Sequence, residues 1–456
     1  MSSDMAAAAV AVHVDQVAEN ASVAAADSKR AGDGNERQPY KRRKKGALER
    51  QNTPAPVYTF ANGYRMVKPY VYEFRTYAKE RWYSLPLLTM FTKEFNAHTP
   101  EYYDLAIRSG RITVNRELAS VDTIIKNGDL IIHKTHRHEP PVSGEDIPIV
   151  YEDDELLAVI KPSSIATHPC GAYRHNSLHT IVQHMRPDLP RLFNVYRLDR
   201  LTSGVIVFAK SSAKANELSQ CIANREASKT YLARVRGQLR LTPGDDSFYE
   251  QLVATAKRNC AASTVTIEPT EDNPDELVLR INCPLRCLSN RDGVHECHEE
   301  GKPSETLVRV HSTPDSETTV VECKPVTGRT HQIRLHLQLI GFPIANDPCY
   351  GGELHYGESQ ARLDAIAVAK AAQNKAKDSQ GSVDVDLITP QQPNESEEEF
   401  MSRTCSWCRI GDADAFNETQ LHCSKIWLHA LEYKLAGHVF KSPYPVWAQK
   451  QATSEE

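Results

Sequence analysis

The spacing of apolar residues predicts a small α/β unit over residues 57–140. Its expected elements are helices at 85–95 and 102–110 and strands at 111–115 and 130–133. Gly110 stands where a left-handed residue commonly ends a helix. Asn127-Gly-Asp129 is typical of a tight turn leading into a strand.

A denser regular pattern covers residues 147–351. It predicts strands at 149–160, 204–209 and 230–236, helices at 212–223 and 330–340, and further short strands over 250–322. The run Gly204–Ala209 is continuously apolar, which is typical of a buried strand. Many antiparallel strands with a few helices indicate an α+β fold, with a mainly antiparallel mixed sheet, flanking helices and the small unit in front.

Shifts in composition divide the chain further. They predict a disordered tail over 1–56, a first folded region over 57–140, a main domain over 141–448 with a flexible insertion at 355–422, and a short tail over 449–456. The first tail contains the basic run 41–45. A nuclear-import signal, a phosphate-binding arm and a solubilising tail all fit this run.

The overall composition is that of a soluble globular protein. Of 456 residues, 40% are hydrophobic and 25% are charged. No run of 18 apolar residues and no signal-peptide pattern is visible, so we expect no membrane association. Eleven irregularly spaced cysteines fit a reducing compartment. We therefore expect a location in the nucleus, the cytoplasm or both, and no obligatory protein partner is evident.

Charge is distributed unevenly along the chain. The formal net charge is −5, yet residues 191–240 carry ten Lys or Arg against three acidic residues, a local charge of +7. A basic island in an acidic chain suits a surface that binds a polyanion. A merely solvated surface would have the same composition.

Asp199 has an unusual local environment for a carboxylate. It lies between Arg197 and Arg200, in a polar segment that leads directly into the buried strand at 204–209. The two arginines favour the ionised form. An ionised, partly desolvated carboxylate can attack an electrophilic carbon and form a covalent intermediate. A structural ion pair is the competing interpretation.

A second segment, 324–338, adds a different set of polar residues. Thr327-Gly328 is expected to cap the start of the helix predicted at 330–340, and Arg329 beside that helix start could hold a phosphate. Arg334 could reach a buried carboxylate. Taken one at a time, these residues could equally lie on a helix surface.

Several ordered motifs resemble those of the RluA-type pseudouridine synthases. They are Lys161-Pro with His168-Pro, Arg197-Leu-Asp-Arg-Leu-Thr-Ser-Gly204, Lys229-Thr-Tyr231, Gly301-Lys-Pro-Ser-Glu-Thr306, Gly328-Arg-Thr-His-Gln-Ile-Arg334, Asp347-Pro-Cys-Tyr-Gly351 and Leu428-His-Ala430. Any one of these motifs alone would be weak, but seven in order are not expected by chance. Residues 57–140 in addition resemble an S4-type RNA-binding domain, as in the eukaryotic branch that acts on tRNA.

This resemblance implies a role for particular residues. Asp199 would be the nucleophile, Arg334 would pair with it, and Tyr231 would stack on the target uracil. The residues expected to contact RNA are Lys161, Arg197, Arg200, Arg329 and His331, together with Arg108 and Arg111 in the S4-like unit. The reaction would use no metal or other cofactor, and the partner would be RNA, most simply tRNA. Tyr196 stands where many bacterial relatives have histidine.

Cysteine and histidine also occur in two loose clusters. Cys405-Ser-Trp-Cys408 is followed by His422-Cys423, and a second cluster contains Cys283, Cys287 and Cys297 with His295 and His298. His133, His136 and His138 form a third group in a strand and linker. Each could hold a metal, although free thiols and exposed histidines explain them as well, and we predict no metal site.

Two other classes of function remain compatible with the sequence. One is an RNA-binding protein that uses the same scaffold without catalysis. The other is an interaction protein stabilised by zinc at the Cys-rich region. The combination of Asp199, Tyr231 and Arg334 favours the enzyme.

Overall fold

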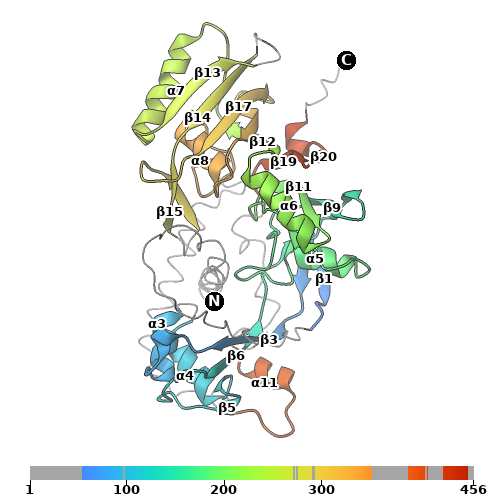
Figure 1. The fold of residues 1–456 in the computed structure, drawn as a ribbon, viewed down its shortest axis with the longest axis vertical. Coiled ribbons are helices and arrows are strands. Elements are labelled where there is room, and N and C mark those ends of the chain that lie inside the picture. Colours follow the sequence, from blue (N-terminus) through green and yellow to red (C-terminus); the bar gives the residue numbers. More distant parts are fainter. Residues whose placement is uncertain are drawn as a thin grey trace, which may run out of the picture. The chain divides into compact units, whose positions relative to one another are not determined.

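The computed structural model describes residues 54–95, 98–270, 273, 276–289, 293–351, 389–405, 408 and 425–449. Residues 1–53 of the tail predicted over 1–56, most of the insertion at 355–422, and His422 with Cys423 lie outside these residues. The described chain divides into two compact units (Figure 1). The small unit contains residues 67–139 and 389–408, and the large unit contains 58–66, 140–351 and 425–449.

The small unit is built on a four-stranded antiparallel sheet. Its strands are β3 (Tyr70–Tyr77), β4 (Ile112–Val114), β5 (Glu117–Leu118) and β6 (Leu130–Arg137), in the order β3-β6-β4-β5. Its helices are α3 (Leu87–Glu94), α4 (Pro100–Arg108) and α11 (Glu397–Arg403), with the 3-10 turn η1 (Glu80–Trp82). Both predicted helices and both predicted strands are confirmed, and Gly110 has the expected positive φ of 78°.

Apolar side chains spaced along α3 and α4 form the core of the small unit. Leu87, Met90 and Ile107 are at most 1% exposed and pack with the buried ring of Trp82. Thr99 caps α4, since its side chain accepts a hydrogen bond from the backbone of Tyr102.

The large unit contains an eleven-stranded sheet. Nine strands follow the order β13-β14-β17-β18-β12-β19-β11-β9-β8, while β10 pairs with β11 and β20 with β19. The strands are β8 (Ile149–Glu152), β9 (Leu156–Lys161), β10 (Phe193–Asn194), β11 (Ser203–Ala209), β12 (Ser228–Arg236), β13 (Thr264–Pro269), β14 (Leu277–Asn282), β17 (Glu305–Ser312), β18 (Thr318–Pro325), β19 (Leu428–Leu435) and β20 (His438–Lys441). The predicted α+β fold with a mixed, mainly antiparallel sheet is confirmed.

Smaller elements complete the large unit. They are a three-stranded sheet of β1 (Tyr58–Ala61), β2 (Tyr64–Val67) and β7 (Val142–Ser143), the hairpin β15 (Leu285–Ser289) with β16 (Val294–Cys297), helices α5 (Leu178–Met185), α6 (Ser212–Ala223), α7 (Asp246–Asn259) and α8 (Gln332–Leu339), and the 3-10 turn η3 (Val446–Ala448). No helix in the described ranges has the length and apolar content that a membrane crossing requires.

The strand β11 positions the segment that carries Asp199. Its residues from Val205 to Ala209 are fully buried, as the apolar run predicts. It pairs in parallel with β19 only at Ser203 and Gly204. A Cβ at Gly204 would lie 2.2 Å from the carbonyl oxygen of Ala430, so only glycine allows the two strands this approach.

Three sequence predictions differ from the structure. Residues 250–259, expected to begin a run of strands, belong to α7, where Asp245 caps a helix whose inner face buries Leu252 and Ala256. The described part of the insertion, which was expected to be flexible, contains α11, which belongs to the small unit. The first domain boundary also shifts, because the β1–β2 hairpin pairs with β7 and belongs to the large unit.

Candidate active site

The loop that carries Asp199 is held through its backbone on both sides. The hydroxyl of Thr167 accepts from the amide of Leu198 at 3.1 Å and donates to the carbonyl of Leu198 at 2.9 Å. On the other side, Nζ of Lys161 donates to the carbonyl of Arg200 at 3.1 Å. Both flanking residues are therefore fixed by buried side chains, which limits the movement of the Asp199 carboxylate.

Lys161 is the centre of this support. It is 0% exposed, and Nζ also donates to the carbonyl oxygens of Pro162 and Ile165, both at 2.9 Å. Burial lowers the pKa of Lys161 to about 7. The three carbonyl acceptors match the three N–H bonds of an ammonium group. The prediction that Lys161 contacts RNA is wrong, because its side chain has no access to solvent.

An arginine and a second carboxylate complete the charge arrangement. Nη1 of Arg334 lies 3.7 Å from Oδ2 of Asp199, while Nε and Nη2 donate to Asp347 at 2.6 and 2.9 Å. The Asp199 side chain is 21% exposed, whereas those of Arg334 and Asp347 are 3% and 1% exposed. Burial alone would lower the pKa of Arg334, but the hydrogen bonds to Asp347 raise it above its usual value. Arg334 is thus a permanent cation beneath an accessible carboxylate.

His331 approaches Asp199 from the start of α8. Its Nε2 lies 3.6 Å from Oδ2 of Asp199, and its Nδ1 is hydrogen-bonded to the hydroxyl of Tyr350 at 2.6 Å. Burial lowers the pKa of His331 to about 4, so the imidazole is neutral at pH 7 and Arg334 carries the positive charge. His331 itself is the N-cap residue with φ of 58°, in place of the expected Thr327-Gly328 cap. The side chain of Gln332 instead accepts from Thr327.

Tyr231 lies on β12 next to an irregularity in its pairing with β19. It is half-buried and packs on two hydrophobic clusters of the large unit. Burial, and secondarily the charge of Asp199, raise the pKa of Tyr231 above its usual value. The phenol is therefore protonated at neutral pH, and its pKa depends in part on the charge of Asp199.

The other residues predicted to contact RNA differ in how far they are exposed. Arg197 and Arg329 are exposed, and the half-buried Arg200 lies over the ring of Tyr173 at 5.5 Å. Tyr196 is stacked on Tyr433 with a ring distance of 4.3 Å, inside the hydrophobic core. The exposed arginines are available to a ligand, whereas the position of Tyr196 serves packing.

Two further candidates lie in the small unit. Arg108 is exposed and paired with Asp104 one helical turn away. Arg111 is 4% exposed, donates to the hydroxyl of Ser109 and lies 5.1 Å from the centre of the Tyr102 ring. The prediction that Arg111 contacts RNA is wrong, since its guanidinium packs inside the unit.

Sequence reasoning missed two residues of this site. Asp347 was recognised only as part of a motif, yet it is the main hydrogen-bond partner of Arg334. Thr167, beside the His168-Pro motif, holds Leu198. A fully buried arginine on a helix requires a carboxylate partner. The need of Arg334 for such a partner was the available signal for Asp347.

The metal-ligating candidates are only partly brought together as expected. Cys405 and Cys408 lie together in the small unit, beside His136 and His138. His133 takes no part in this group, because its imidazole is hydrogen-bonded to Tyr102 at 3.1 Å. Within the described ranges, this is the group of His, Cys, Asp and Glu side chains with the spacing of metal ligands.

The chain was also compared with known proteins. Residues 155–339 match the family model for RNA pseudouridylate synthase. The chain is 31% identical to Pseudouridylate synthase RPUSD2 of Homo sapiens, over 90% of this chain and 78% of that protein. It is also 31% identical to the mitochondrial tRNA pseudouridine(32) synthase of Saccharomyces cerevisiae, over 85% and 77% of the two chains. The tRNA pseudouridine(31) synthase of the same yeast is 31% identical over 86% and 97%.

Proposed function

Because the chain belongs to the RNA pseudouridylate synthase family, we propose that Asp199 is the nucleophile with which it converts uridine in tRNA to pseudouridine. The RluA-type family inferred from the motifs is thereby confirmed. The observation that carries the role of Asp199 is its geometry. The carboxylate is partly exposed, stands on a loop that is fixed from both sides, and lies 3.7 Å from the buried Arg334. Two of the relatives are tRNA pseudouridine synthases, which supports tRNA as the substrate.

The proposed reaction begins with a covalent step. An oxygen of the Asp199 carboxylate forms a bond to C1′ of the nucleotide, and the N1–C1′ bond breaks with its electron pair going to the uracil. After the base rotates, C5 attacks C1′ and displaces the carboxylate. The proton lost from C5 is balanced by one gained at N1, so the product is an isomer of the substrate.

Arg334 and Tyr231 have separate parts in this proposal. Arg334 pairs with the Asp199 carboxylate and orients it before the attack. Once the carboxylate is an ester, it no longer carries the charge that helps to raise the pKa of Tyr231. Burial, the main cause of that raised pKa, persists, so the phenol stays protonated, and the part proposed for Tyr231 is to stack its ring on the uracil.

Access to the uracil requires that the nucleotide leave its stack, since its reacting atoms are enclosed in a helix. The exposed Arg197, two residues before Asp199, is suited to occupy the space left behind. Unpaired loops are the preferred targets because unstacking costs less there. The S4-like small unit, with the exposed Arg108, would bind flanking RNA.

The proposal is tested with tRNA that contains uridine tritiated at C5. Wild-type protein is expected to release tritium to water, because C5 loses its hydrogen only when the new glycosidic bond forms. The control is an RNA of the same base composition without folded loops. Absence of release from the complete tRNA pool, with normal RNA binding, would favour the alternative of a non-catalytic RNA-binding protein.

Replacement of Lys161 by methionine is expected to reduce turnover more than RNA affinity. The variant leaves three buried carbonyl groups without their donor, each at a cost of about 1–3 kcal/mol, and loosens the Arg200 side of the loop. The measurements are kcat, KM and the midpoint of urea unfolding. If Lys161 contacts RNA instead, KM rises and the unfolding midpoint stays at the wild-type value.

A further inference from the structure

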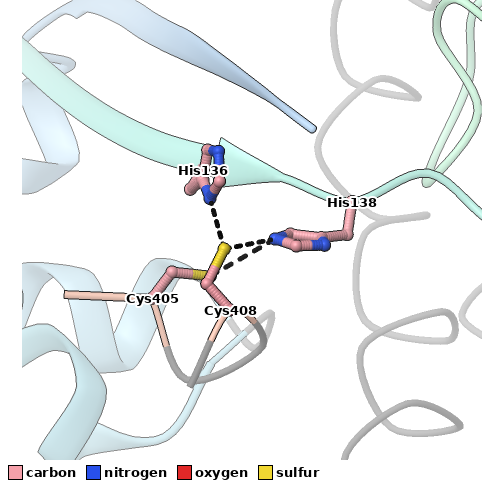
Figure 2. Close-up of side chains that lie close together, drawn as sticks. All are labelled: His136, His138, Cys405 and Cys408. Carbon is pink, nitrogen blue, oxygen red and sulfur yellow. Dashed lines mark hydrogen bonds between the residues drawn. The ribbon is translucent and has the colours of Figure 1, made fainter. Parts of the chain in front are cut away.

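Four side chains from two distant segments converge in the small unit. His136 is in β6 and His138 follows that strand directly. Residues two apart along an extended chain have side chains on the same face. Cys405 and Cys408 follow α11. The four ligand atoms all lie within 4.8 Å of one another, and the thiols point toward the imidazoles (Figure 2). Cys405 and His138 are 267 residues apart along the chain.

The distances agree with those around a tetrahedral metal ion. Sγ of Cys408 lies 3.2 Å from Nδ1 of His136 and 3.4 Å from Nε2 of His138, and Sγ of Cys405 lies 3.5 Å from the same Nε2. Bond lengths of zinc to sulfur and nitrogen place such atoms about 3.6 Å apart in a tetrahedron. All pairs of the four ligand atoms lie within 4.8 Å, so the group is compact enough to surround one ion.

The four side chains of the group are partly enclosed by the small unit. Cys405 is 7% exposed, and Cys408, His136 and His138 are half-buried, so solvent reaches the group only in part.

Apolar burial and ion pairs also hold the described part of the segment 389–408 within the small unit. Phe400 and Met401 of α11 are buried, and two exposed ion pairs join Glu397 to Lys134 and Glu398 to Lys68. Exposed ion pairs contribute about 0–1 kcal/mol each. A seven-residue helix is not stable in isolation, so a bond to a shared ion would add to these contacts.

We propose that His136, His138, Cys405 and Cys408 bind one zinc ion that fastens the segment 389–408 to β6. Two thiolates and two imidazoles in a tetrahedral arrangement are the donor set that zinc prefers. All four positions are taken by the protein, so the ion has a structural role and no open position for a substrate. The site is separate from Asp199 and does not depend on the proposed reaction.

The first test measures metal in the complete protein, purified without chelator. Elemental analysis is expected to give about one zinc per chain. Cobalt(II) added to metal-free, reduced protein is expected to produce the charge-transfer and d–d absorption bands of a tetrahedral thiolate site. Absence of zinc, together with no such bands on addition of cobalt, would overturn the proposal. A disulfide between Cys405 and Cys408 under reducing purification would overturn it as well.

Variants identify the ligands. Cys408→Ser is expected to lower zinc content at least ten-fold, whereas Cys221→Ser, which alters a half-buried thiol on α6, is expected to leave it unchanged. His136→Cys keeps a ligand and is expected to retain zinc while changing the cobalt spectrum. Retention of zinc by His136→Cys would show that a substitution at this site does not by itself misfold the chain. Equal zinc content in Cys408→Ser and wild type would assign the metal to other residues.

Discussion

Asp199→Asn is expected to abolish pseudouridine formation. The amide has nearly the same size as the carboxylate but is not a nucleophile, so no bond to C1′ can form. Loss of a nucleophile reduces turnover by at least roughly 10³-fold in enzymes of comparable design. RNA affinity is expected to stay within a few-fold of wild type, because phosphate contacts dominate that affinity. Tritium release and fluorescence anisotropy measure the two quantities.

A matched control is available in the same unit. Asp188 is an exposed carboxylate paired with Arg186, so Asp188→Asn removes one negative charge without reaching the site. Its turnover is expected to equal that of wild type. Substantial turnover by Asp199→Asn, in protein free of wild-type contamination, would exclude Asp199 as the nucleophile.

Arg334→Met is expected to destabilise the large unit and to inactivate it. The variant leaves the fully buried carboxylate of Asp347 without its cation, and breaking a buried ion pair in this way costs about 3–5 kcal/mol. It also removes the positive charge 3.7 Å from Asp199. The free energy of unfolding in urea and the rate of tritium release are the measurements.

The double variant Arg334→Met with Asp347→Asn separates these two effects. The asparagine no longer carries a buried charge, and its side-chain oxygen can still accept from the amide of Cys349. We expect stability to recover in part and activity to remain lost, because Asp199 still lacks its cation. Recovery of both would mean that Arg334 acts only through the fold.

Local elements were largely predictable because their signals are local. The apolar run at 204–209 and the glycine after α4 each determine one element without help from distant residues. Even α11 had a local signal, since Ser396 and Glu399 form a capping box in a segment otherwise judged polar and flexible. The motifs brought Asp199 and Arg334 together correctly, at 3.7 Å.

Partners between distant residues were less predictable. The family resemblance placed Lys161 among the residues that contact RNA, whereas its three acceptors are carbonyl groups, one of them 39 residues away. The sequence grouped Cys405 and Cys408 with the nearby His422 and Cys423, which lie outside the described residues. Their neighbours in space, His136 in β6 and His138 directly after it, lie more than 260 residues earlier in the chain. Sequence distance gives no guide to such pairs.

The division of the chain has a practical consequence for dissecting the protein. Residues 58–66 belong to the large unit although they precede the small one, and residues 389–408 belong to the small unit although they follow most of the large one. A truncation that begins at residue 140 would therefore remove β1 and β2 from one unit. It would also leave Phe400, Met401 and two thiols without the surface that covers them. Loss of activity in such a fragment would report damaged folding and not a requirement for RNA recognition.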